Sequence, residues 1–120
     1  MNNKEIVLKF YEEVFIGGDL THIDEFMRDD YRQHSPEVAD GKAGFVNFAK
    51  GFLAQKPRIE IVKVVAEDDM VVVFFKCKIG EHTHKVFDMY RLKDGKLAEH
   101  WDSIMGNVDE IPCASGNGHF

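Results

Sequence analysis

Residues 88–102 read Asp88-Met89-Tyr90-Arg91-Leu92-Lys93-Asp94-Gly95-Lys96-Leu97-Ala98-Glu99-His100-Trp101-Asp102. Two alternating runs flank an Asp-Gly pair, and this pattern predicts a β-hairpin. Polar residues stand at strand positions where a purely structural hairpin carries apolar ones: Asp88 on the first strand, His100 and Asp102 on the second. Carboxylates are depleted in strands and costly to bury alone, so the pattern indicates a polar pocket within an apolar sheet.

The turn determines whether these three polar side chains share a face. A two-residue Asp94-Gly95 turn pairs Lys93 with Lys96 and directs Asp88 to the opposite face from the other two. A three-residue loop with a left-handed glycine pairs Leu92 with Lys96 and gathers all three on one face. The local sequence leaves both registers open.

We favour the three-residue, bulged loop because it collects the polar groups at one site. The same register leaves an apolar set on the other face of the hairpin: Phe87, Met89, Leu97 and Trp101. Such a patch is larger than a monomer usually exposes, so we expect a homodimer formed through this convex sheet face.

Length and composition bound the class of protein. With 120 residues and 13.8 kDa, the chain is expected to form one domain over residues 1–120. The net charge of −6, without a Lys/Arg cluster, argues against a nucleic-acid partner. The longest apolar run, Met70 to Phe75, is too short to span a membrane, and two cysteines without a signal segment favour the cytoplasm.

The periodicity of apolar residues changes once along the chain. Helical spacing predicts helices over residues 3–16 and 42–55, with a shorter one between them that Asp19 caps. Alternation predicts strands over residues 59–66, 70–79, 85–92 and 97–104, and an extended segment over residues 31–36. Helices followed by consecutive strands predict the α+β class with an antiparallel or mixed sheet.

The order of elements and several motifs together resemble the SnoaL-like branch of the NTF2-like superfamily, in particular its aldol condensation-catalysing group, which is often bacterial. The motifs are Tyr31-Arg32-Gln33-His34-Ser35-Pro36 with Asp40-Gly41, the Val86 to Arg91 strand, the hairpin quoted above, and Asn117-Gly118-His119-Phe120. The resemblance implies a cone-shaped fold, in which a strongly curved sheet wraps around helices and encloses a pocket for a small apolar molecule.

The resemblance also implies roles for individual residues. Asp102 corresponds by position to the acid that such enzymes use, and burial among Phe and Met side chains would let it exchange a proton near neutral pH. His100 would orient it or shuttle its proton, and Asp88 would be a second pocket acid. The expected function is cofactor-independent proton abstraction beside the carbonyl of a small apolar compound; a non-catalytic binding module and a hydrolase remain alternatives.

Three further residues are candidates for the substrate pocket: His34 at its mouth, and Tyr31 and Tyr90 in its wall. Each also has a structural interpretation, as a loop histidine bonded to the backbone or as aromatic rings at the edge of the core. His82 and His84 have a spacing that suits a metal, but no third ligand is evident, so we expect a solvated strand edge and no metal.

Overall fold

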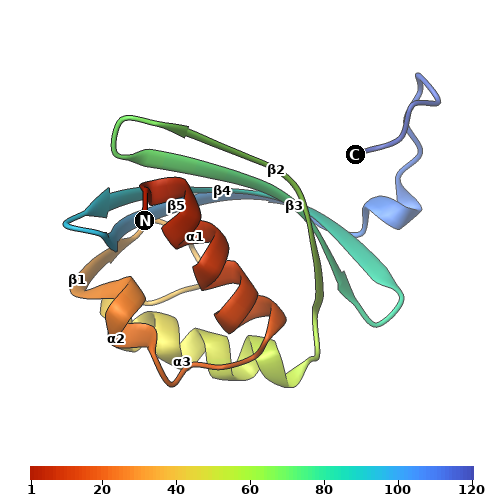
Figure 1. Ribbon diagram of the computed structural model, residues 1–120. Helices are drawn as coiled ribbons and strands as arrows, with labels where there is room; N and C mark the ends of the chain where they lie inside the picture. Colours follow the sequence, from red (N-terminus) through yellow and green to blue (C-terminus); the bar gives the residue numbers. More distant parts are fainter.

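A five-stranded sheet curved over the N-terminal helix forms the body of the protein in the computed structural model, which describes residues 1–120 (Figure 1). The strand order is β1-β5-β4-β3-β2. The strands are β1 (Met27–Gln33), β2 (Arg58–Glu67), β3 (Met70–Ile79), β4 (His82–Lys93) and β5 (Lys96–Met105). All pairings are antiparallel except β1 with β5, so the sheet is mixed and the expected α+β class is confirmed.

The N-terminal helix covers the concave face of the sheet. It begins as α1 (Asn3–Phe10), where the Asn2 side chain accepts a hydrogen bond from the Glu5 amide, and continues as the π-helix η1 (Tyr11–Ile16). Its buried side chains follow one stripe: Ile6, Val7, Phe10, Tyr11 and Val14. The predicted helix over residues 3–16 is therefore continuous, but its last turn is wider than an α-helix and closes with a bond from the Gly17 amide to the Glu12 carbonyl.

Two further helices complete this layer, with α3 (Gly41–Ala54) lying beside β1. The short helix α2 spans only Ile23–Phe26, and the prediction that Asp19 caps it is wrong. Asp19 Oδ1 accepts a hydrogen bond from the Thr21 amide, which forms a local turn before the helix begins. Carboxylate-to-backbone turns of this kind compete with a helix N-cap for the same side chain.

Strand β1 begins earlier than the extended segment expected over residues 31–36. It starts at Met27 and ends at Gln33, and its parallel partner is β5, with Gln33 opposite His100. Parallel pairing brings together residues far apart in the chain, and no local pattern predicts it. This pairing places the motif that contains Gln33 and His34 directly beside the hairpin strand that carries His100.

The β4–β5 hairpin combines the two turn geometries considered for it. The turn has two residues, because Lys93 pairs with Lys96 and both Asp94 (φ 52°) and Gly95 (φ 77°) are left-handed. The predicted three-residue loop is therefore wrong, although Gly95 has the expected positive φ. The extra residue lies three positions after Gly95, at Ala98, where the register shifts so that Arg91 pairs with Glu99.

The bulge at Ala98 decides which side chains face the helices. Without an extra residue, the two-residue turn would direct Asp88 to the face opposite His100. With it, Asp88 pairs directly with Asp102, and Tyr90 pairs with His100. A second register shift, between Ile61 and Lys63, lies in β2, which bends strongly around the helical layer in Figure 1.

The prediction that Leu97 belongs to the apolar convex face is wrong. It is fully buried in the core next to the buried Ala98, because the bulge directs both side chains inward. Phe87, Met89 and Trp101 do lie on the face away from the helices, where Phe87 stacks on Phe74 with 4.3 Å between ring centroids. Phe120 also stacks on Phe74, so the C-terminus packs against this face. The homodimer stays a prediction, with Phe87, Met89 and Trp101 as the remaining residues of its proposed interface.

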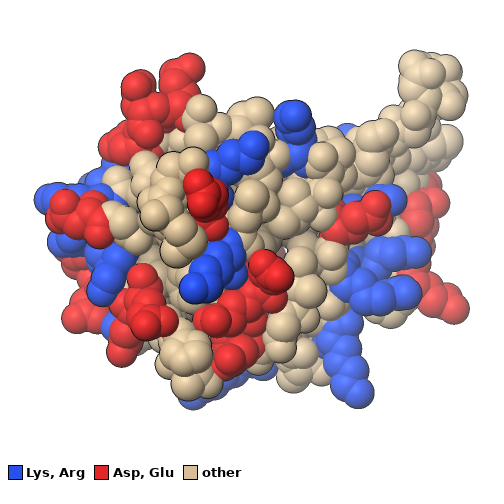
Figure 2. All heavy atoms as spheres, viewed as in Figure 1, with Lys and Arg blue, Asp and Glu red and all other residues tan.

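The surface charges are mixed in sign. Figure 2 shows acidic and basic side chains interspersed on the face seen in Figure 1, without a continuous basic stripe. No helix has the length and apolar composition needed to cross a membrane.

The hairpin turn generates a stability prediction. Gly95→Ala should lower the free energy of unfolding by about 1 kcal/mol, because an alanine side chain is strained at positive φ. Steric clash does not contribute, since an added Cβ would only come into ordinary van der Waals contact with Ile6 Cδ1, at 3.9 Å. The measurement is urea unfolding followed by circular dichroism.

Gly51→Ala is the matched control, because Gly51 lies inside α3 with open space around its Cα. There the same substitution should raise the free energy of unfolding by roughly 0.5–1 kcal/mol. Equal urea midpoints for Gly95→Ala and the unaltered protein would contradict the role of the left-handed turn.

Candidate active site

A cavity of about 510 Å³ opens between α3 and the concave face of the sheet. Thirteen of its 22 lining residues are hydrophobic, so most of the cavity wall is apolar. Helix α3 contributes Phe45, Phe48 and Phe52 to the wall. The polar groups gather where β4 and β5 pair, and include Asp88, His100 and Asp102 from the predicted site.

Asp88 and His100 form a buried hydrogen-bonded pair. His100 Nε2 lies 2.9 Å from Asp88 Oδ1, and the two side chains are only 9% and 8% exposed. A carboxylate removed from water to this extent is stable only when several donors surround it. The rest of the network supplies those donors.

Two tyrosines complete the shell around Asp88. The hydroxyl of Tyr11, from η1, donates to Asp88 Oδ2 and lies 2.8 Å from the Tyr90 hydroxyl. Because Tyr11 donates its one proton to the carboxylate, Tyr90 is the donor in the contact between the two phenols. The same Tyr90 proton is shared with Asp88 Oδ2, which lies 3.3 Å from the Tyr90 hydroxyl. The N-terminal helix is therefore joined to the sheet through a buried charge.

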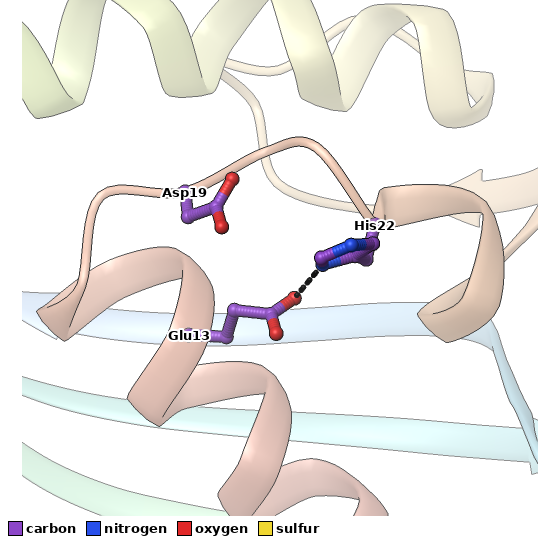
Figure 3. A group of neighbouring side chains, drawn as sticks. All are labelled: Glu13, Asp19 and His22. Atoms are coloured by element: carbon purple, nitrogen blue, oxygen red, sulfur yellow. Dashed lines mark ion pairs between the residues drawn. The ribbon is translucent and has the colours of Figure 1, made fainter.

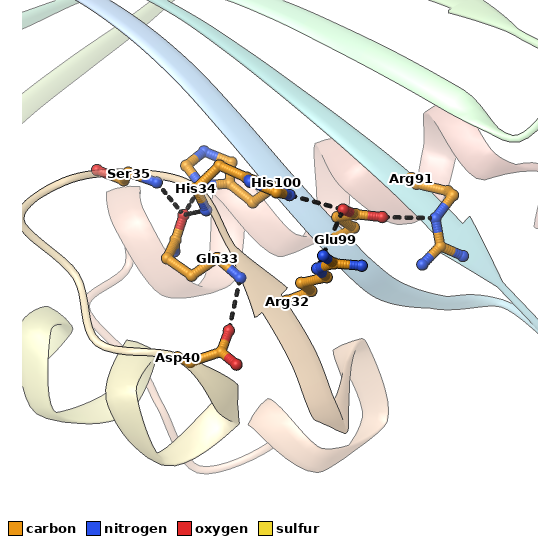
Figure 4. Close-up of polar contacts among 8 residues, drawn as sticks. All are labelled: Arg32, Gln33, His34, Ser35, Asp40, Arg91, Glu99 and His100. Carbon is orange, nitrogen blue, oxygen red and sulfur yellow. Dashed lines mark hydrogen bonds and ion pairs between the residues drawn. The ribbon is translucent and has the colours of Figure 1, made fainter.

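Gln33 occupies the other side of the imidazole (Figure 4). Its Oε1 atom lies 2.7 Å from His100 Nδ1 and also accepts hydrogen bonds from the backbone amides of His34 (3.1 Å) and Ser35 (3.0 Å). The backbone N–H of Gln33 donates to Asp40 Oδ1 at 2.8 Å. Both nitrogens of His100 are thus engaged, one by Gln33 and one by Asp88.

Asp102 differs from its neighbours because its side chain makes no hydrogen bond to the rest of the protein. It is directly opposite Asp88 on the adjacent strand, lines the cavity and is half-buried. One carboxylate oxygen of Asp88, one of Asp102 and one ring nitrogen of His100 all lie within 4.8 Å of one another. The three residues predicted from the hairpin are therefore together, and Asp102 is the carboxylate that remains available to a bound molecule.

Tyr31 and Tyr90 line the cavity beside the imidazole of His100, with ring centroids at 6.4 Å and 4.8 Å. Burial raises the pKa of both phenols well above 10, and the charge of Asp88 adds to this effect. For Tyr31 the charge of Asp102 contributes as well. The phenols therefore remain hydrogen-bond donors near neutral pH. The cavity also contains Cys77, whose thiol has its pKa raised to about 11 by burial, so it stays protonated.

His34 does not line the cavity and lies with Glu99 and Trp101, whose positions on β5 alternate with those of His100 and Asp102. Its ring stacks on Trp101 at 4.9 Å, and its Nε2 lies 2.6 Å from Glu99 Oε2. Arg91 Nε also donates to Glu99, at 3.1 Å (Figure 4). The hydrogen bond from His34 and those of Arg91 lower the pKa of Glu99. The structure thus places His34 in a polar cluster outside the pocket.

Two other groups of side chains have the spacing of metal ligands. Glu13, Asp19 and His22 meet where the π-helix ends, and His22 Nδ1 lies 3.4 Å from Glu13 Oε2, a buried oxygen without a hydrogen bond (Figure 3). His82 is exposed and pairs with Asp109 and Glu110 at 3.6 and 3.8 Å. The His22–Glu13 ion pair and the Asp19–Thr21 turn hold the first group together, and two ion pairs of His82 hold the second.

His84 does not join His82 in a metal-binding pair. It lines the cavity, and its Nδ1 accepts a hydrogen bond from the Asn107 amide at 3.3 Å. His82, by contrast, is exposed as expected for a strand edge.

Sequence reasoning missed Tyr11 and Gln33. Tyr11 lies on the buried stripe of the N-terminal helix, and a buried phenol usually has a hydrogen-bond partner, which could have marked it. Gln33 is two residues after Tyr31 on one strand, so both side chains lie on the same face once β1 is recognised.

Comparisons with known proteins agree with this fold. A model described as the SnoaL-like domain matches residues 7–100, and no curated protein matches the chain. A candidate polyketide cyclase from Acidithiobacillus ferrooxidans aligns with a TM-score of 0.73 at 20% identity, over 85% of this chain and 87% of that one.

Two structures from Streptomyces are similarly close. IdmH, a candidate polyketide cyclase from Streptomyces antibioticus, has a TM-score of 0.70 at 17% identity and covers 87% of this chain and 92% of its own. AclR, a candidate hydroxylase from Streptomyces galilaeus, has a TM-score of 0.72 at 21% identity and covers 86% of this chain and 88% of its own. At these identities the likeness concerns the fold alone, which supports more than one chemistry.

The buried phenols generate a prediction for alkaline pH. The chain has three tyrosines, Tyr11, Tyr31 and Tyr90, and all three have a pKa raised well above 10 by burial. Their protons are retained in the folded state above the pH at which an unfolded chain loses them, near pH 10. Stability is therefore fully present below about pH 10 and should fall as the pH rises further.

Tyrosinate absorbance in the near ultraviolet measures this effect. The folded protein should show no tyrosinate at pH 10, and its appearance at higher pH should coincide with loss of the circular dichroism signal. The same protein in concentrated urea should titrate near pH 10, which is the control. A folded protein with a midpoint near 10 would contradict the buried network.

Proposed function

The chain belongs to the SnoaL-like domain family, and from this premise we propose that it is an acid/base enzyme that removes a proton beside the carbonyl of a small apolar compound. The reaction class would be an aldol cyclisation or an isomerisation. The observation that carries the proposal is the unpaired Asp102 carboxylate, which lines an apolar cavity next to a hydrogen-bonded Asp88–His100 pair.

Asp102 is the proposed general base. A base must reach the proton that it abstracts, and a carboxylate already saturated with donors is a poor acceptor. Asp88 receives hydrogen bonds from Tyr11 and Tyr90 and contacts His100, whereas Asp102 receives none from the protein. The expected role of Asp88 as a second pocket acid therefore becomes, in our proposal, that of a buried charge that positions His100.

Tyr31 is the proposed donor to the developing enolate oxygen. Its phenol lines the cavity and remains protonated, because burial and the nearby charges of Asp88 and Asp102 raise its pKa. A preorganised hydroxyl in a site shielded from water stabilises negative charge more than it would in bulk water. His100 would act on the substrate only through its electrostatic field, since Gln33 and Asp88 already occupy its two nitrogens.

The phenylalanine-rich wall supports a largely apolar substrate with one or two oxygen functions. Phe45, Phe48 and Phe52 face a cavity of about 510 Å³, within the range of pockets that enclose small organic molecules. The few polar groups of the cavity would then orient the substrate carbonyl. The proposed chemistry needs only these acid and base groups and no bound cofactor.

A non-catalytic binding module is the second candidate. The saturation of the Asp88–His100 network favours it, because these two side chains have no free hydrogen-bonding atom for a ligand unless a contact breaks. In that case Asp102 would only orient the bound molecule. Measured proton exchange separates the two candidates, and release of alcohol or diol from an ester or epoxide probe would indicate a hydrolase instead.

Asp102→Asn should abolish the proposed catalysis and leave binding intact. We expect the rate of hydrogen–deuterium exchange beside the carbonyl of small aromatic ketones to fall about 10²- to 10⁴-fold, as for loss of a general base. Naphthol, which mimics an enolate, should still bind, since asparagine removes a like charge without emptying the cavity. Proton NMR measures the exchange, and naphthol fluorescence measures the binding.

Asp68→Asn is the matched control, because Asp68 lies exposed in a turn at φ 54°, a conformation that asparagine adopts readily. It should change neither quantity. Exchange that persists in Asp102→Asn would exclude Asp102 as the base, and naphthol binding without exchange in the unaltered protein would favour the binding module.

A further inference from the structure

The hydrogen bonds at Gln33 identify which nitrogen of His100 carries a proton. Gln33 Oε1 contacts the backbone N–H groups of His34 at 3.1 Å and Ser35 at 3.0 Å. A backbone N–H can only donate, so this atom of the Gln33 amide must be the oxygen. The orientation of the amide follows from its partners, which is how such side chains are assigned.

The same oxygen then determines the proton at His100. Nδ1 lies 2.7 Å from Gln33 Oε1, and an oxygen without a proton can only accept, so Nδ1 must carry hydrogen. The other nitrogen, Nε2, lies 2.9 Å from Asp88 Oδ1. Two atoms that both lack hydrogen would repel at this distance, so one further proton must lie between Nε2 and Oδ1.

We infer that Gln33 is a positioning residue that holds His100 in its Nδ1–H form and so obliges the His100–Asp88 contact to keep a proton. This proton lies either on His100, giving an imidazolium beside a carboxylate, or on Asp88, giving a neutral imidazole beside a carboxylic acid. The net charge of the pair is zero in both cases. Without Gln33, a neutral imidazole would place its hydrogen on Nε2 and donate to the Asp88 carboxylate. The pair would then carry one negative charge.

The charge of the pair matters for Asp102, which lies opposite Asp88 on the neighbouring strand. Two like charges at one site do not ionise independently, and the second carboxylate holds its proton more tightly. A neutral His100–Asp88 pair leaves Asp102 as the one net negative charge at this end of the cavity. Gln33 would thus keep Asp102 available as a base, a consequence that rests on the proposed function.

Other titratable groups around the pair do not disturb this balance near neutral pH. They are Tyr11 from η1, Tyr31 from β1, Cys77 from β3 and Tyr90 from β4. Burial, followed by the charge of Asp88, raises the pKa of each, so all four remain uncharged. His84 and Glu37 also line the cavity, but neither makes a hydrogen bond or an ion pair with His100, Asp88 or Asp102.

Long-range proton–nitrogen NMR spectra of nitrogen-15-labelled protein test the inference without any substrate. His100 is assigned by the signal lost in His100→Gln. In the unaltered protein we expect the neutral His100 imidazole to carry its hydrogen on Nδ1, beside Gln33 Oε1. A neutral His100 found in the Nε2–H form would overturn the inference.

Two substitutions at the same position separate the hydrogen bond from the bulk of the side chain. Gln33→Met removes the acceptor, so neutral His100 should change to the Nε2–H form. Gln33→Glu retains an oxygen that can accept the same three donors, so Nδ1–H should be restored. Persistence of Nδ1–H in a folded Gln33→Met protein, judged by circular dichroism, would also overturn the inference.

Proton exchange into small aromatic ketones links the inference to catalysis. In Gln33→Met the profile of exchange against pH should move to higher pH, because a negatively charged His100–Asp88 pair would lie opposite the Asp102 carboxylate. An unchanged profile despite the altered tautomer would overturn the link to Asp102. If the unaltered protein shows no exchange, the proposed function fails, while the NMR result still decides the role of Gln33.

Discussion

Burial of the Asp88 carboxylate inside an apolar sheet is the constraint on which the remaining structure depends. An isolated charge at this position would be strongly destabilising, so the fold must bring donors to it from several elements. Tyr11 comes from the N-terminal helix, Tyr90 from the same strand and His100 from the next one. The helix and the sheet are therefore held in one relative position by a polar network as well as by the apolar core.

The network also explains how the site divides its roles. Donors saturate Asp88, and Gln33 and Asp88 occupy both nitrogens of His100, which makes these groups rigid and poorly available to a ligand. Asp102, one strand away, is unpaired and faces the apolar cavity. A preorganised scaffold with one free reactive group is the arrangement expected where side chains are positioned before a ligand binds.

The three polar residues of the hairpin were identified from their types and spacing, and the structure brings them together. The predicted three-residue turn was wrong, because an Asp-Gly pair is compatible with two loop lengths. The extra residue that sets the register is Ala98, and nothing in the local sequence distinguishes it. Gln33 and Tyr11 were not identified, since each reaches the site only through a contact with a distant segment. His34 is near the site in sequence but is directed to the other face.

Amino-acid patterns alone determined the class of fold, most of the helices and strands, and the presence of a polar site in the final hairpin, because alternation and helical periodicity are local properties of the chain. Tertiary structure decided the rest. Parallel pairing of β1 with β5 brings Gln33 to His100, the bulge at Ala98 selects the face of Asp88, and packing of the N-terminal helix brings Tyr11 to the carboxylate. Each of these contacts joins residues distant in the chain, and the energies that select them arise only when the elements pack together.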